Sequence, residues 1–249
     1  MGLKKKVCEE GFPLVSDPGS GNLHLTKKES VMNKNFSFVI GRVAALSVAV
    51  ETAVFAFSLI WEVILPTEFA KNLGYIASLL IAISVVIMMA CLYDGTREQS
   101  KIFGLLALVS SIIYVPFCIS TYFLQLSIVA LNPLGLSSEV LKAITFKPGS
   151  PTFAIDMLGY GFLCLSTLAA GFALSDTKDK VLRALCFFHG ALAVPTLASP
   201  IISGVFLSTS GETDNTGNYV LLFWCIIFVP IALLFMRYFK TARTGDLDI

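Results

Sequence analysis

The residues of this chain with the clearest chemical potential are a few ionisable side chains inside long apolar stretches. Glu51, His189 and Asp156 each interrupt such a stretch. If these stretches lie in lipid, a charge at their centre costs at least about 2.5 kcal/mol even on the most lenient insertion scale. An ionisable group kept in such a place is typical of a functional site, so these three residues are the first candidates.

Glu51 and His189 lie at similar depths in their stretches. Counted from the basic residues Arg42 and Arg183, and at about 1.5 Å per helical residue, they lie roughly 13 Å and 9 Å from the same edge. We therefore expect the two side chains to be coupled in the inner half of a helix bundle. A structural alternative stays open for each: a neutral carboxyl group bonded between helices, and a neutral imidazole bonded to backbone or Ser.

Asp156, Gln125 and Glu62 are expected near the opposite edge, where they could form the mouth of a pathway for a small solute or ion. Structural interpretations exist here too. Asp156 is near an expected helix N-terminus, where the helix dipole favours an acidic residue. Glu62 follows Trp61, as expected for an anchor at the membrane interface.

Six transmembrane helices are the elements that must position these side chains. Hydrophobic residues make up 55% of the chain and charged residues only 14%, which is unusual for a soluble domain. A span needs roughly 20 mostly apolar residues. The segments that qualify are Val43–Leu65, Leu73–Leu92, Ile102–Leu131, Thr152–Leu174, Val181–Leu207 and Tyr219–Met236. The sequence therefore predicts an all-α, polytopic membrane protein in contact with the lipid bilayer.

Helical spacing places further polar residues on shared faces of these spans. In span 3, the residues Ser111, Tyr114, Cys118, Thr121 and Gln125 recur at steps of three and four. Spans 1, 4 and 5 have similar faces, whereas spans 2 and 6 have few polar residues. We expect spans 1, 3, 4 and 5 to line a polar interior, and spans 2 and 6 to face more lipid. Close helix packing is the structural alternative, because small polar residues also serve it in membranes.

The distribution of Lys and Arg predicts the orientation. Basic residues are concentrated before span 1, after spans 2 and 4, and after span 6, while the connection 208–218 has none. By the positive-inside rule, both termini are cytoplasmic. We expect a disordered cytoplasmic tail over residues 1–35, one transmembrane domain over 36–240, and a short cytoplasmic tail over 241–249.

The longest connection, Asn132–Pro151, follows span 3 on the outer side. Residues 137–142 are expected to form a short helix at the membrane interface. The loop then ends in a Pro-Gly turn, after which Ser150 can cap the next helix and Pro151 suits its first position. Span 4 is therefore predicted to begin abruptly.

The sequence contains no motif that specifies a reaction. Zinc-protease, nucleophile-elbow and nucleotide-binding signatures are absent, no Lys lies inside a span to hold a retinal, and the cysteine spacing encodes no zinc site. We expect no cofactor, no metal and no nucleic-acid partner, and an enzyme is disfavoured. The two remaining functions are a transporter or channel for a small solute or ion, and a non-catalytic sensor or assembly component with a packed interior.

The segment FKPGSPTFAIDMLGY, residues Phe146–Tyr160, resembles part of a group of small six-span membrane proteins of bacteria and archaea. The likeness extends loosely from span 1 to span 6 and leaves out the N-terminal tail. No activity is established for that group. The resemblance therefore implies a six-helix fold in the cytoplasmic membrane of a prokaryote, and no mechanism.

Overall fold

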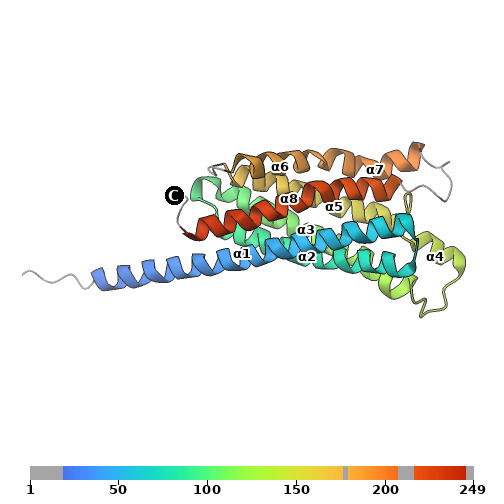
Figure 1. The fold of residues 1–249 in the computed structure, drawn as a ribbon, viewed down its shortest axis with the longest axis horizontal. Helices are drawn as coiled ribbons and strands as arrows, with labels where there is room; N and C mark the ends of the chain where they lie inside the picture. Colours follow the sequence, from blue (N-terminus) through green and yellow to red (C-terminus); the bar gives the residue numbers. More distant parts are fainter. Residues whose placement is uncertain (1–18, 176–178, 207–215, 245–249) are drawn as a thin grey trace, which may run out of the picture. The chain divides into compact units, whose positions relative to one another are not determined.

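The structure, a computed structural model, describes residues 19–175, 179–206 and 216–244. This part of the chain is all-α, and six of its helical segments are long and apolar enough to cross a membrane, which confirms the predicted fold class (Figure 1). The elements are α1 Gly19–Ile64, α2 Glu68–Gly95, the 3-10 turn η1 Glu98–Ser100, α3 Lys101–Leu124, the π-helical turn η2 Gln125–Val129, α4 Ser138–Ile144, α5 Pro151–Ala173, α6 Lys180–Ala191, α7 Ala193–Phe206 and α8 Thr216–Thr244. Helices α6 and α7 together make span 5.

The chain divides into two compact units after Asn33, and the helix bundle belongs to the second, Lys34–Ile249. Helix α1 begins at Gly19, so the helical state of residues 19–33 differs from the predicted disordered tail. Extending an existing helix adds one hydrogen bond per residue without a new nucleation cost, which favours helix in a stretch next to a span. Of the predicted tails, 1–35 and 241–249, residues 1–18 and 245–249 lie outside the described residues.

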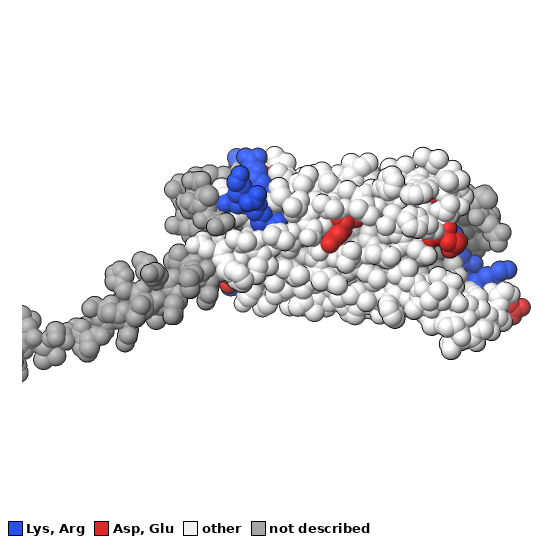
Figure 2. Space-filling view, turned by 60° about the horizontal axis from the view of Figure 1, so that its bottom comes forward, with Lys and Arg blue, Asp and Glu red and all other residues white. Residues whose placement is uncertain are grey.

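The outer surface of the bundle is apolar between its two ends. Large side chains such as Val43, Ile102, Val181 and Ile226 are exposed on it. Figure 2 shows that most of this belt is free of charged residues, that acidic atoms interrupt it near its middle, and that most of the visible Lys and Arg atoms lie at one end. Exposed apolar area of this extent suits the hydrocarbon core of a bilayer rather than water.

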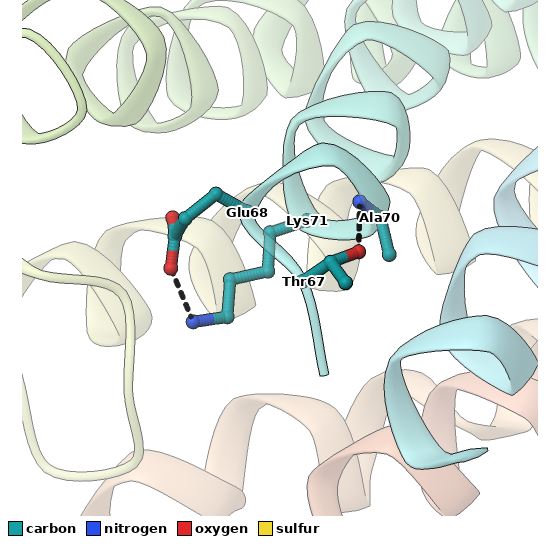
Figure 3. Close-up of polar contacts among 4 residues, drawn as sticks. All are labelled: Thr67, Glu68, Ala70 and Lys71. Carbon is teal, nitrogen blue, oxygen red and sulfur yellow. Dashed lines mark hydrogen bonds and ion pairs between the residues drawn. The ribbon is translucent and has the colours of Figure 1, made fainter. Parts of the chain in front are cut away.

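Helix α2 starts abruptly because its first turn is capped. The Ala70 backbone N–H donates a hydrogen bond to Thr67 Oγ1 at 3.2 Å, and Lys71 Nζ pairs with Glu68 Oε1 at 3.1 Å (Figure 3). The cap satisfies an amide that has no partner within the helix, and an acidic residue in the first turn complements the helix dipole. The connection from α1 is therefore short.

Span 3 and the loop after it follow the sequence prediction closely. The span ends in the π-helical turn η2, and α4 is the predicted short helix. Gly149 has a φ of 82°, which the turn before α5 requires. Ser150 Oγ accepts from the Phe153 N–H at 3.2 Å, and Pro151 is the first residue of α5, as predicted.

Span 5 is two helices because Pro195 has no N–H to bond the carbonyl of Ala191. The Leu192 N–H bonds to the His189 carbonyl at 3.0 Å instead, and the Thr196 N–H bonds to the Leu192 carbonyl at 3.0 Å. His189 therefore lies in the last turn of α6, next to a break in the span.

Helix α5 packs along α3, and it also contacts α6 and α7, while α3 also packs along α2. Half of the central stretch of α2 is buried, the same share as in α5, and Trp224 and Phe228 of α8 are buried as well. Spans 2 and 6 are more buried than spans 3 and 5, so the prediction that spans 2 and 6 face more lipid than the others is wrong. Their inward faces are built of apolar and aromatic side chains, which a search for polar residues does not detect.

Candidate functional site

Asp156 is a carboxyl group buried within a membrane span. Its side chain is 0% exposed, and its Oδ2 accepts a hydrogen bond from the Tyr122 hydroxyl of α3 at 2.9 Å. Its Oδ1 has no hydrogen-bond partner among the described residues, and no described basic side chain pairs with it. Asp156 lies in the second turn of α5, beyond the first turn in which the helix dipole is effective. The dipole therefore does not explain a carboxyl group here.

Two tyrosine hydroxyls near Asp156 also have unused hydrogen-bonding capacity. Tyr114 and Tyr160 are buried with their ring centroids 5.8 Å apart. Tyr114 interacts with Cys118 and Tyr160 with Tyr122, but neither hydroxyl makes a hydrogen bond of ordinary geometry in the described part of the chain. Asp156 is close enough to interact electrostatically with both of them and with Tyr122. An unpaired buried polar atom costs about 1–3 kcal/mol. We call Asp156, Tyr114, Tyr122 and Tyr160 the acid–tyrosine cluster.

Further aromatic rings surround this cluster. The Tyr122 ring lies 5.5 Å from that of Tyr75 and 5.9 Å from that of Phe146, and the Tyr160 ring meets Trp224 edge-on at 5.4 Å. Aromatic faces carry partial negative charge. The tyrosines of the cluster therefore lie in surroundings that are compatible with a positive charge.

Gly159 allows α3 and α5 to approach each other at this point. A Cβ on Gly159 would lie 3.0 Å from the nearest side-chain carbon of α3 and 3.5 Å from the Cys118 backbone nitrogen. Small residues permit such close packing of membrane helices. Because residues four apart share a helical face, Asp156 and Tyr160 then lie together on α5 and face α3.

Gln125 holds the loop between α4 and α5 against the end of span 3. Its Nε2 donates to the Ile144 carbonyl at 3.0 Å, and its Oε1 accepts from the Phe146 N–H at 2.9 Å. We call these two bonds the Gln125 clasp. Since Phe146 packs on Tyr122, the clasp fixes this loop beside the acid–tyrosine cluster. Thr121, one turn earlier, is buried, and its hydroxyl has no partner among the described residues.

His189 has a hydrogen bond at each ring nitrogen. Trp224 Nε1, which can only donate, bonds to His189 Nε2 at 2.8 Å, so Nε2 carries no proton. Nδ1 therefore carries the proton and donates to Thr167 Oγ1 at 2.7 Å, and Thr167 donates to the Cys164 carbonyl at 2.8 Å. The imidazole is held as one neutral tautomer that joins α5, α6 and α8. This arrangement agrees with the alternative interpretation of His189 as a neutral imidazole that is hydrogen-bonded within the bundle.

Glu51 has its partner on α2. Ser84 Oγ donates to Glu51 Oε1 at 3.0 Å, while Oε2 has no partner in the described part of the chain. Unlike Asp156, Glu51 is partly exposed on the outside of the bundle. Both nitrogens of His189 are occupied by side chains of other helices, so the predicted pairing of Glu51 with His189 is wrong. Equal depth in a membrane does not determine which helices face each other.

The predicted site residues thus fall into three groups. Asp156 and Tyr114 belong to the acid–tyrosine cluster, Thr121 of α3 and Gln125 of η2 lie next to it in span 3, and Glu51 and His189 belong to separate hydrogen-bonded contacts. Tyr122, Ser84 and Trp224 are the partners that the sequence does not predict. Trp224 has a detectable signal, because an indole N–H inside an apolar span needs an acceptor.

The donor atoms of the cluster restrict what it could hold. The described residues contain no group of three or more His, Cys, Asp or Glu side chains placed to hold a metal ion. The cluster combines one carboxyl group with neutral hydroxyls. Divalent cations are usually bound by more oxygen ligands, often several of them carboxylates. A monovalent cation or a neutral polar group fits this set better.

Comparison of the chain with protein-family models, curated proteins and solved structures finds no match. The resemblance of residues 146–160 to small six-span prokaryotic proteins therefore remains a prediction. The polytopic membrane fold is supported by the six spans themselves. Function has to be inferred from the geometry of the site.

Proposed function

We propose that the protein is a membrane transporter for a small polar solute or ion, and that the acid–tyrosine cluster is its binding site. One observation carries the proposal. Asp156 is completely buried within a span, has no described counter-charge, and has one oxygen without a hydrogen-bond partner. Ionisable groups are costly inside membranes, and those present commonly belong to substrate or ion pathways.

The break in span 5 supports the same function. Helix α7, beyond the break at Leu192, packs against α5, the helix that carries Asp156 and Tyr160. Many transporters place a broken helix beside a binding site in the membrane. The break provides a point at which half of a span can change its tilt while the backbone hydrogen bonds of both halves stay intact.

The expected location follows from the spans and the charges. Six spans place both termini on one side of the membrane, and the Lys and Arg distribution favours the cytoplasm for that side. The cytoplasmic membrane of a prokaryote is the proposed location. The acid–tyrosine cluster and the Gln125 clasp then lie toward the outer face.

Osmotic swelling of proteoliposomes tests the proposal. Purified protein in vesicles is challenged with glycerol, glycine, potassium acetate, potassium chloride and methylammonium chloride, and swelling is followed by light scattering. We expect at least one solute to enter faster than into protein-free vesicles, and Asp156→Asn to slow that entry by about tenfold or more, as for loss of a charged hydrogen bond.

Glu51→Gln is the matched control, because it removes a carboxyl group of a span that is outside the cluster. It should retain the wild-type rate. The proposal is overturned if no solute in the panel enters faster than into protein-free vesicles, or if Asp156→Asn swells like the wild type. Either result favours the non-catalytic sensor or assembly component.

A further inference from the structure

We propose that the acid–tyrosine cluster binds a small primary ammonium ion, R–NH3+. The inference rests on the proposed function for its biological role, because it names the class of solute. The binding itself can be measured without any flux. Charge, hydrogen-bond donors and aromatic surroundings each support this class.

The charge of the site favours a cation. Burying a carboxylate is costly unless a counter-charge lies beside it, and no described basic side chain pairs with Asp156, so burial alone favours the neutral carboxyl group. A ligand with a single positive charge would stabilise the ionised form of this one carboxyl group. An anion would add repulsion to that form, and a neutral solute would give it no counter-charge.

Three buried oxygens have unused hydrogen-bonding capacity. Asp156 Oδ1 and the hydroxyl oxygens of Tyr114 and Tyr160 make no hydrogen bond of ordinary geometry in the described part of the chain, although Tyr114 interacts with Cys118 and Tyr160 with Tyr122. A primary ammonium group has three N–H donors, the same number as these oxygens. A quaternary ammonium ion carries the same charge but no N–H, so it would leave all three oxygens unpaired.

The aromatic surroundings favour a ligand with an apolar part. The rings of Tyr75 and Phe146 pack on Tyr122, and Trp224 packs on Tyr160. Aromatic faces attract cations and accept apolar groups. An ammonium ion with a short apolar substituent therefore suits these surroundings better than K+, which has no apolar part.

Fluorescence of Trp224 provides a direct test. Trp61 and Trp224 are the two tryptophans of the chain, so Trp61→Phe leaves Trp224, which contacts the cluster through Tyr160, as the single reporter. The full-length variant in detergent is titrated with methylammonium chloride, and KCl keeps the ionic strength constant. Tetramethylammonium, with no N–H, and methanol, with no charge, are the comparison ligands. Thermal unfolding with and without methylammonium gives a second, independent readout.

We expect a saturable change with methylammonium, and binding at least about tenfold weaker for tetramethylammonium and methanol. Asp156→Asn should weaken methylammonium binding by about tenfold to a hundredfold. Tyr160→Phe should weaken methylammonium binding by about threefold to tenfold, and should not change the response to tetramethylammonium. Glu51→Gln should bind like the wild type.

The inference is overturned if methylammonium changes neither the fluorescence nor the unfolding temperature. It is also overturned if tetramethylammonium binds as tightly as methylammonium, or if the Asp156→Asn variant binds methylammonium with the affinity of the wild type. These results are separable from the transport test. Asp156-dependent entry of glycerol, glycine or acetate without methylammonium binding would disprove the ligand class and keep the proposed function. Asp156-dependent methylammonium binding without any flux would keep the ligand class and disprove the transport function.

Discussion

Trp224 Nε1 donates a hydrogen bond to His189 Nε2 at 2.8 Å, and this bond joins α8 to α6. The bond continues through the imidazole to Thr167 of α5. The Trp224 ring also stacks on Phe228 at 4.7 Å, which fixes the direction of the indole N–H. The last three spans of the chain are therefore connected by polar contacts in which each donor has an acceptor.

Removing the Thr167 hydroxyl should destabilise this contact. Thr167→Val keeps the shape of the side chain and leaves the N–H of His189 Nδ1 without an acceptor, so we expect a loss of about 1–3 kcal/mol in the free energy of unfolding. Thr52→Val is the control, because Thr52 is equally buried but bonds only to the Val48 carbonyl of its own helix. Denaturant unfolding in detergent measures both variants. Equal losses would show that the His189 contact has no special role.

Changes at Asp156 and Tyr122 should have opposite effects on stability. Tyr122→Phe leaves Asp156 Oδ2 without its partner, so we expect a loss of about 1–3 kcal/mol. Asp156→Asn keeps an oxygen that accepts from Tyr122 and removes the ionisable group, so the unliganded protein should be as stable as the wild type or more stable. Thermal unfolding without added ligand compares the two. A larger loss for Asp156→Asn than for Tyr122→Phe would contradict the geometry described here.

Breaking the Gln125 clasp should loosen the loop before α5 and leave the rest of the bundle intact. Gln125→Leu leaves the Ile144 carbonyl and the Phe146 N–H without partners, at a local cost of about 1–3 kcal/mol for each group. Hydrogen exchange at Phe146 should then be faster by about tenfold or more. Ser127→Ala, which removes an exposed hydroxyl bonded within the same segment, should leave this exchange rate unchanged. Unchanged exchange in Gln125→Leu would show that the clasp does not hold the loop.

Gly190 is needed for the close packing of α6 on α5. A Cβ at this position would lie 2.6 Å from Leu168 Cβ and 2.8 Å from Leu168 Cα, so the two helices would have to separate. We expect Gly190→Ala to lower the free energy of unfolding by about 1–3 kcal/mol, as for other overpacked sites. Gly217→Ala, whose added Cβ would meet nothing within 4 Å, should be neutral or slightly stabilising. Similar stability of the two variants would contradict the predicted overpacking at Gly190.

Several elements could be predicted from the sequence because their causes are local. A span requires length and apolar composition, and six segments meet that requirement independently of their neighbours. The start of α5 is local too, since Ser150 and Pro151 act within one helical turn. Asp156 stands out for a similar reason, as a carboxyl group inside an apolar stretch.

The partners of the polar residues could not be predicted, because they depend on how helices rotate against one another. Periodicity shows that Tyr114 and Gln125 share a face of span 3, but it does not show that Gln125 bonds to the backbone at the end of α4 and in the loop after it. Depth along the membrane made Glu51 and His189 look like partners. Their actual partners, Ser84 and Trp224, lie in the two spans with the fewest polar residues, so the apolar character of a span is poor evidence that it avoids the interior.

The bond between His189 and Trp224 can form only after the last span has been synthesised. His189 lies in the fifth span, and its partner lies in the last. While the chain emerges from the ribosome, the imidazole therefore enters the membrane before the indole that will satisfy it exists. In a nascent chain that stops before α8, the Nε2 atom of His189 has no hydrogen-bond donor from Trp224. Only insertion of the final span provides that donor.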